Sequence, residues 1–244
     1  IMQQIATLLG KPGDAEKYGK QAAEIKQSFN HTFWNKSTLK YDRDSQAANA
    51  VAIYMGLTED KNREQTFRNL VADIRKRDNA LTAGDVGYRY VLRALEENNA
   101  SDIIYDMNCK YDVPGYGWQL AHGATSLTES WQAYGFVSNN HCMLGHLMEW
   151  LFSGLGGIRQ AEHSIAFKEI VFKPEVVGDI RDASVSYESV YGVISSDWKD
   201  SEQEFTLRVE VPANSFASVY LPTLELSAIT ESGIPLNAVN GVLN

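Results

Sequence analysis

The chain has 244 residues, of which 44% are hydrophobic, 11% aromatic and 22% charged. This composition excludes a disordered, collagen-like or low-complexity chain, because five Trp, twelve Tyr and nine Phe supply enough apolar surface for a core. The net charge of −9 and the lack of an apolar run of roughly 20 residues predict no nucleic-acid partner and no membrane insertion.

The first ten residues already have the periodicity of a helix. They contain neither an N-capping residue before the helix nor a signal peptide, and Ile1 takes the place of an initiator methionine. We therefore expect this chain to be a segment of a longer protein, and its compartment stays open.

Up to about Gly157, apolar residues recur every three or four positions, with Gly, Pro or Asn at the breaks. Helices joined by short loops predict an all-helical layer, and Trp34 and Trp150 are expected in its core. The predicted helices lie at 1–10, 14–34, 47–54, 60–74, 88–95, 101–107 and 143–152.

After Gly157 the period of the apolar residues changes from 3.6 to 2, which is typical of strands. The predicted strands lie at 169–174, 183–188, 190–198, 205–211 and 215–222. Short strands separated by polar turns predict an antiparallel β-sandwich with Trp198 in its core and a structural role. The sequence thus predicts two domains, 1–157 and 158–244.

The two cysteines, Cys109 and Cys142, lack the short spacing to His or Cys that a zinc site requires, and we expect both to be buried as small hydrophobes. His141 and His146 are five residues apart, which differs from the four-residue spacing of a metal pair on a helix. No metal and no cofactor are therefore expected.

The irregular stretch 111–131 is the predicted functional region, because loops on a rigid scaffold carry most binding residues. It combines aromatic side chains, glycines and one central carboxylate, Glu129, and this mixture suits a sugar pocket. Taken alone, Glu129 is better explained as a helix-capping or salt-bridged carboxylate, and His141 as a satisfied loop histidine. Asp85 is a candidate contact for a sugar hydroxyl.

Several motifs resemble those of the bacterial α-L-rhamnosidases of glycoside hydrolase family 78. The most specific is Gly-Ala-Thr-Ser-Leu-Thr-Glu-Ser-Trp at 123–131, followed by Ser-Asn-Asn-His at 138–141 and Gly-His-Leu-Met-Glu-Trp-Leu at 145–151. The run at 114–118 and the helix start at 41–50 are also similar to family patterns. Further likeness continues through 156–192, so the resemblance covers nearly the whole chain.

The resemblance implies an (α/α)6 barrel followed by a β-sandwich, and a glycosidase that inverts the anomeric centre of terminal α-L-rhamnose. It implies that Glu129 is the general base and that His141 contacts the sugar. Many members carry tryptophan where Thr128 stands here, so Trp118 and Trp131 are expected to form the stacking wall. Tyr116 belongs to the same aromatic run and is a further candidate for substrate binding.

An inverting glycosidase also needs a general acid roughly 6.5–9.5 Å from the base. In the family this acid lies in a motif N-terminal to everything present in this chain. A full ring of twelve helices needs well over roughly 300 residues, so we expect a partial barrel that is inactive by itself. The expected partner of the whole protein is a rhamnose-containing glycoside or polysaccharide. A non-catalytic carbohydrate-binding or scaffold fragment remains the alternative, as does another helical-barrel activity such as a glucuronidase or phosphorylase.

Overall fold

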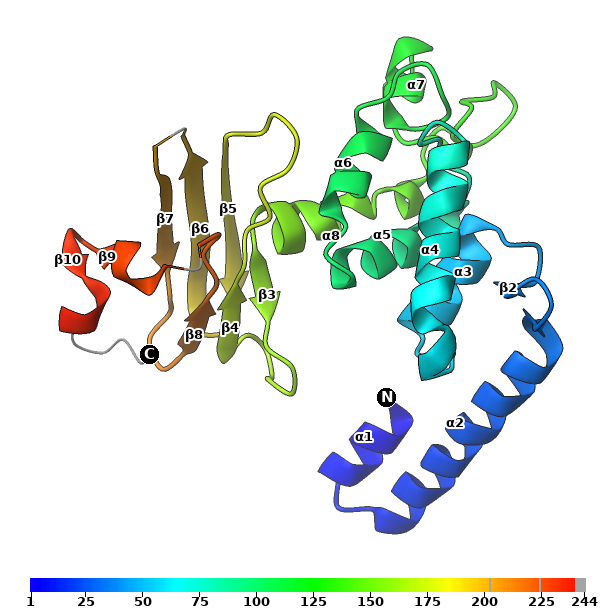
Figure 1. Ribbon diagram of the computed structural model, residues 1–244, viewed down its shortest axis with the longest axis horizontal. Coiled ribbons are helices and arrows are strands. Elements are labelled where there is room, and N and C mark those ends of the chain that lie inside the picture. Colours follow the sequence, from blue (N-terminus) through cyan, green and yellow to red (C-terminus); the bar gives the residue numbers. More distant parts are fainter. Residues whose placement is uncertain (202, 224, 240–244) are drawn as a thin grey trace. The chain divides into compact units, whose positions relative to one another are not determined.

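The computed structural model describes residues 1–201, 203–223 and 225–239. The chain divides into two compact units, Ile1–Leu151 and Phe152–Asn244. The first unit is built almost entirely of helices and the second mainly of strands (Figure 1). This succession confirms the predicted order of a helical part followed by a β part.

The helical unit contains most of the predicted helices near their expected positions. Two elements were not predicted: the short helix α7 and a small β-hairpin after α2. The elements are α1 (Met2–Leu8), α2 (Pro12–Phe33), β1 (Trp34–Asn35), β2 (Lys40–Tyr41), α3 (Gln46–Tyr54), α4 (Asp60–Lys76), α5 (Asp85–Glu97), α6 (Ser101–Asn108), α7 (Tyr116–Ala121), the 3-10 helix η1 (Cys142–Leu144) and α8 (Leu147–Trp150).

Helix α5 forms the centre of the helical unit. Its buried residues include Tyr88, Val91, Leu92 and Leu95, which recur at three- and four-residue spacing and so form one apolar face. This helix packs against both α3 and α6. Helix α3 begins at Ser45, whose hydroxyl accepts the N–H of Ala48, as an N-capping residue does.

The prediction of one continuous helix at 143–152 is wrong. The structure has η1, then α8, and then a π-helical turn, Leu151–Leu155. Gly145 separates η1 from α8, and the hydroxyl of Tyr116 donates to the carbonyl of Leu144. Because this carbonyl is taken by a side chain and glycine weakens a helix, the segment is broken where the periodicity alone predicted continuity.

In the part of the β unit that the structure describes, the strands form two three-stranded sheets and a small hairpin. The sheets follow the orders β3-β4-β8 and β5-β6-β7, and the hairpin pairs β9 with β10. The strands are β3 (Ile158–Gln160), β4 (Glu169–Phe172), β5 (Asp182–Ser189), β6 (Gly192–Asp200), β7 (Phe205–Glu210), β8 (Phe216–Val219), β9 (Thr230–Glu231) and β10 (Ile234–Pro235).

The two sheets share an apolar core, as a sandwich requires. Ile158, Ile170 and Phe172 come from one sheet and Ile194 from the other. The pairings are antiparallel as predicted, except that β8 runs parallel to β4. Periodicity of 2 does not encode strand direction, so this exception was invisible in the sequence.

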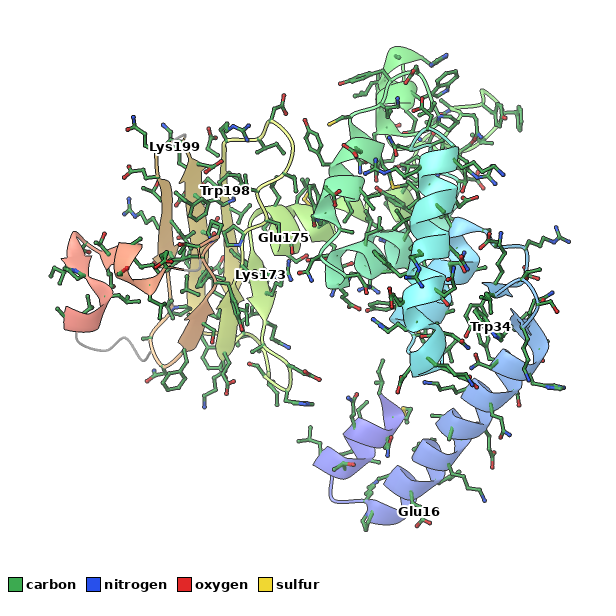
Figure 2. The ribbon with its side chains drawn as sticks, in the orientation of Figure 1. Glu16, Trp34, Lys173, Glu175, Trp198 and Lys199 are labelled. Carbon is green, nitrogen blue, oxygen red and sulfur yellow. The ribbon has the colours of Figure 1, made fainter. Side chains whose placement is uncertain are left out.

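Two of the three tryptophans that were expected in the core are buried. Trp150 donates its indole N–H to the Ser101 hydroxyl at 2.8 Å. Trp198 and its neighbour Lys199, both labelled in Figure 2, alternate along β6 between buried and exposed. Trp34, at the start of β1, is only half-buried. The core prediction therefore holds for Trp150 and Trp198 and does not hold for Trp34.

The expectation of buried cysteines is wrong, because Cys109 and Cys142 are both exposed free thiols. Cys109 directly follows α6 as its C-capping residue, and Cys142 is the first residue of η1. Helix ends face solvent more often than helix centres, since their unpaired backbone groups need water or caps.

Because Tyr41 is buried, the free energy of unfolding depends on pH in the alkaline range. Its hydroxyl donates to Asn30 Oδ1 at 2.5 Å, and burial, assisted by the charge of Glu59, raises the pKa of Tyr41 from 10.0 to about 12. The unfolded chain ionises this phenol first, so its contribution to stability is complete below pH 10 and is lost as pH rises towards 12. We expect Tyr41→Phe to reduce the alkaline slope of the free energy of unfolding by up to about 1.4 kcal/mol per pH unit.

Urea unfolding of the full-length protein between pH 8 and pH 11 measures this slope. Tyr111→Phe changes an exposed ring and is the matched control, which should keep the wild-type slope. An identical slope in wild type and Tyr41→Phe would contradict the prediction.

Candidate active site

Two loop segments, 127–129 and 138–141, lie side by side, and we call them the two arms of the loop. Glu129 lies on the first arm and His141 on the second. The N–H of Glu129 donates to the Ser138 carbonyl at 2.9 Å, and the N–H of His141 donates to the Leu127 carbonyl at 2.9 Å. The hydroxyl of Ser126 adds a third bond, to the carbonyl of Asn139. These bonds between the two arms fix the register of the loop.

Glu129 is an exposed carboxylate with one backbone partner. Its Oε2 accepts the N–H of Ser138 at 3.2 Å. The preceding residue, Thr128, is buried, and its hydroxyl donates to the carbonyl of Ser130 at 2.6 Å. An oriented, solvent-accessible carboxylate is able to accept a proton from water. Thr128 instead stabilises the turn at 128–130 through its bond to Ser130.

His141 and Asp85 form a pair across 56 residues of sequence. His141 Nε2 lies 3.2 Å from Asp85 Oδ2, and the side chains are 20% and 38% exposed, respectively. Asp85 is the first residue of α5, and its Oδ1 accepts the N–H of Val86 at 2.9 Å. The hydrogen bond from His141, followed by the bond from Val86, lowers the pKa of Asp85.

Trp131 belongs to the core of the helical unit. Its side chain is 4% exposed, and its indole N–H donates to the carbonyl of Ala83 at 2.6 Å. The rings of Tyr88 and Tyr116 pack against it in T-shaped geometry, with centroids at 4.9 and 5.1 Å. A ring enclosed in this way presents no open face to a sugar, so its position does not suit the stacking wall expected of it.

Tyr116, another expected substrate contact, is also engaged inside the helical unit. Its hydroxyl donates to the Leu144 carbonyl, and burial raises the pKa of Tyr116 to about 12. The Tyr116 ring packs against Trp131 and the hydroxyl bonds Leu144, so Tyr116 is placed to connect α7 with η1 rather than to contact a ligand.

Trp118 is half-buried on α7. Its ring stacks on His122 with centroids 3.9 Å apart, and its indole N–H donates to the Gln132 carbonyl at 3.2 Å. Of the two tryptophans expected to form the stacking wall, Trp118 is therefore the one whose burial remains compatible with ligand contact.

Three residues with local roles were missed as site residues. Ser138 orients Glu129 through its backbone, and buried Gln119 donates to the Ser130 carbonyl at 3.1 Å. At Gly117 an added Cβ would overlap the backbone of Lys110. Because almost every residue has a backbone N–H, nothing in the sequence marked Ser138 as a partner of Glu129. The glycine between two aromatic residues at 117 was a usable sign that the backbone approaches another segment closely there.

The described residues contain no group of three or more His, Cys, Asp or Glu side chains able to hold a metal ion. Within the same residues, no helix is long and apolar enough to cross a membrane.

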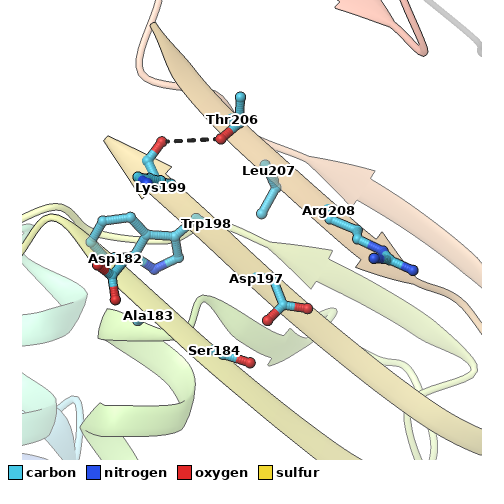
Figure 3. A pocket seen from close by; sticks show the side chains of 9 residues that line it. All are labelled: Asp182, Ala183, Ser184, Asp197, Trp198, Lys199, Thr206, Leu207 and Arg208. Atoms are coloured by element: carbon cyan, nitrogen blue, oxygen red, sulfur yellow. Dashed lines mark hydrogen bonds between the residues drawn. The ribbon is translucent and has the colours of Figure 1, made fainter. Parts of the chain in front are cut away.

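A hollow of about 400 Å³ lies on the β5–β6–β7 sheet of the β unit (Figure 3). Two acidic and two basic side chains are among the residues that line it, and a bond from the Thr206 hydroxyl to the Lys199 carbonyl, 3.4 Å long, joins β7 to β6. This balance of charge gives no preference for an anionic or a cationic ligand. Its lining residues are Asp182, Ala183, Ser184, Asp197, Trp198, Lys199, Thr206, Leu207 and Arg208.

The helical unit thus carries a glutamate and a histidine on paired loop segments, and a unit of two β-sheets follows it in the sequence. Residues 1–155 match the bacterial α-L-rhamnosidase six-hairpin glycosidase domain, and residues 157–233 match the bacterial α-L-rhamnosidase C-terminal domain. The chain therefore belongs to the bacterial α-L-rhamnosidase family, which confirms the resemblance and the fold class predicted from the motifs.

Named relatives agree with this assignment. An α-L-rhamnosidase of Streptomyces avermitilis is 28% identical over 231 residues, which are 91% of this chain and 22% of that protein. An α-L-rhamnosidase of Formosa agariphila is 26% identical over 232 residues, which are 91% of this chain and 25% of that protein.

Solved structures give the same result. The α-L-rhamnosidase from Dictyoglumus thermophilum superposes with a TM-score of 0.88 at 28% identity, covering 98% of this chain and 27% of that one. The Streptomyces avermitilis α-L-rhamnosidase complexed with L-rhamnose superposes with a TM-score of 0.85 at 26% identity, covering 92% of this chain and 22% of that one. The chain thus spans about a quarter of the length of the proteins it matches.

Proposed function

We propose that the full-length protein is a glycoside hydrolase that releases terminal α-L-rhamnose with inversion of the anomeric centre, and that Glu129 is its general base. The observation that carries the proposal is the exposed Glu129 carboxylate, oriented by the Ser138 N–H on a loop that is paired with the His141 segment. Membership of the α-L-rhamnosidase family supports the substrate class.

In the proposed reaction Glu129 removes a proton from a water molecule as that water attacks the anomeric carbon. The leaving oxygen on the opposite face of the sugar must be protonated by a second carboxyl group. We assign this general acid to residues outside the present chain. The alignment of Glu129 by a backbone donor matters here, because a general base must lie within hydrogen-bond reach of the proton that it removes.

Among the remaining candidates, His141 is proposed to contact a sugar hydroxyl and Trp118 to stack on the sugar ring. Tyr116 and Trp131 are proposed to support the site from the core, in line with their burial and ring contacts. No metal or cofactor has a role in the proposed reaction.

We further propose that 1–157 is part of an (α/α)6 barrel and that 158–244 is a β-sandwich with a structural role. The match of 1–155 to a six-hairpin domain supports the barrel. Helix α2 supports the proposal that this barrel is incomplete. None of its 22 residues is buried, although Ile25 and Phe33 are large and apolar side chains that a neighbouring helix would cover.

The test is hydrolysis of an aryl α-L-rhamnoside by the full-length protein, followed by proton NMR during the first turnovers. We expect rhamnose to be released first as the β-anomer, because a single in-line displacement inverts the α-linkage. Residues 1–244 alone are expected to show no turnover, since they lack the acid.

First release of the α-anomer would overturn inversion, and hydrolysis by residues 1–244 alone would overturn the external acid. If the full-length protein binds rhamnosides without cleaving them, the alternative of a carbohydrate-binding or scaffold protein replaces the enzyme. Cleavage of a glucuronide or phosphorolysis in place of rhamnoside hydrolysis would instead favour another helical-barrel activity.

A further inference from the structure

Asp85 lies beside His141, and neither the local sequence pattern nor the family motifs predicted this pairing. Both of its carboxylate oxygens have partners: Oδ1 accepts the N–H of Val86 at 2.9 Å, and Oδ2 lies 3.2 Å from His141 Nε2. The sequence predicted a contact from Asp85 to a sugar hydroxyl. With both oxygens already engaged, Asp85 is better placed to act on His141 than on a ligand.

The charge state of Asp85 determines which nitrogen of His141 carries a proton. The bonds from His141 and Val86 lower the pKa of Asp85, and its place at the start of α5 adds the favourable end of the helix dipole. An ionised carboxylate only accepts hydrogen bonds. His141 Nε2 must therefore be the donor, and in the neutral form of an imidazole this leaves Nδ1 as an acceptor.

A second bond ties the same short segment to the Glu129 loop. The carbonyl of Ala83, two residues before Asp85, accepts the indole N–H of Trp131, two residues after Glu129. Residues 83–85 thus hold both arms of the loop, one through Trp131 and the other through His141. The position of His141 relative to Glu129 is fixed from outside the loop as well as within it.

We propose that Asp85 is a positioning residue that orients the His141 imidazole and fixes its Nε2–H tautomer, so that Nδ1 accepts a hydrogen bond from a hydroxyl of the bound sugar. This inference rests on the proposed function for the identity of the ligand. The pairing of Asp85 with His141 does not depend on it.

Asp85→Asn in the full-length protein tests the proposal. One amide cannot satisfy two donors: if its oxygen takes the Val86 N–H, its NH2 faces His141 Nε2 and favours the opposite tautomer. We expect kcat/KM for an aryl rhamnoside to fall about 10- to 100-fold, the size of the loss when a carboxylate that orients a metal-binding histidine is removed. The loss should appear mainly in KM, because the contact exists before the transition state.

Two measurements and one control variant separate positioning from a general structural effect. In the His141→Ala background, Asp85→Asn should have almost no further effect, because Asp85 acts through the missing ring. Histidine-selective 15N NMR should show the Nε2–H tautomer of His141 in the wild type, and loss of that signature in Asp85→Asn and Asp85→Ala. Asp102→Asn removes a carboxylate from the first turn of α6 and is the control that should leave KM and the His141 signal unchanged.

An Nδ1–H tautomer in the wild type, or the same cost of Asp85→Asn with and without His141, would overturn the proposal. If the wild-type protein fails to cleave rhamnosides, the proposed function fails, while the 15N spectra still decide the role of Asp85.

Discussion

Replacing Glu129 with glutamine in the full-length protein is expected to lower kcat for an aryl rhamnoside by about 10²- to 10⁴-fold. Glutamine keeps the size of the side chain and an oxygen for the Ser138 N–H, which bonds the Glu129 carboxylate at 3.2 Å, but it cannot take a proton from water. Rhamnose binding, measured by calorimetry, should change little, because the neutral sugar does not depend on the charge of the base. Steady-state kinetics should place the loss in kcat rather than in KM.

Glu162→Gln provides the matched control. Its side chain is 90% exposed and lies in the β unit, so the same change of charge there should leave kcat within about two-fold of wild type, as is usual for surface substitutions. If Glu129→Gln retains most of the wild-type turnover, Glu129 is not the general base. If it abolishes rhamnose binding as well as turnover, the carboxylate serves binding rather than proton transfer.

Truncation of Trp198 to alanine is expected to destabilise the β unit by about 3–5 kcal/mol. The indole lies inside the unit, 2% exposed, and its N–H donates to the Leu155 carbonyl at 2.7 Å. The variant loses this packing and leaves the partly buried Leu155 carbonyl without its indole donor. Such a loss is a large part of the roughly 5–15 kcal/mol that stabilises a typical domain.

Hydrogen exchange of the full-length protein, followed by mass spectrometry, measures this effect locally. Peptides from β5, β6 and β7 should exchange more than about 100-fold faster in Trp198→Ala, since the free energy of opening falls. Val190→Ala alters an exposed side chain of the same unit and should leave these rates nearly unchanged. Unaltered protection in Trp198→Ala would show that the indole is not a principal source of stability in the β unit.

Local patterns in the sequence determined the elements of this protein. The three- and four-residue spacing of Tyr88, Val91 and Leu95 is sufficient to predict helix α5, and the alternation around Trp198 is sufficient to predict β6. Both patterns work because side-chain direction repeats with the backbone geometry of a helix or a strand. The motif around Glu129 likewise identified the family without any knowledge of the fold.

The tertiary structure alone decided how these elements meet. It placed Trp131 in the core, where periodicity offered no warning, because the bond to Ala83 joins residues 48 apart in sequence. It paired Asp85 with His141, and it interrupted the helix predicted at 143–152 between Leu144, whose carbonyl accepts the Tyr116 hydroxyl, and Leu147. Contacts between distant residues leave no periodic trace in a single sequence, so most of the elements and the family were readable from the chain, whereas the roles of individual side chains required the fold.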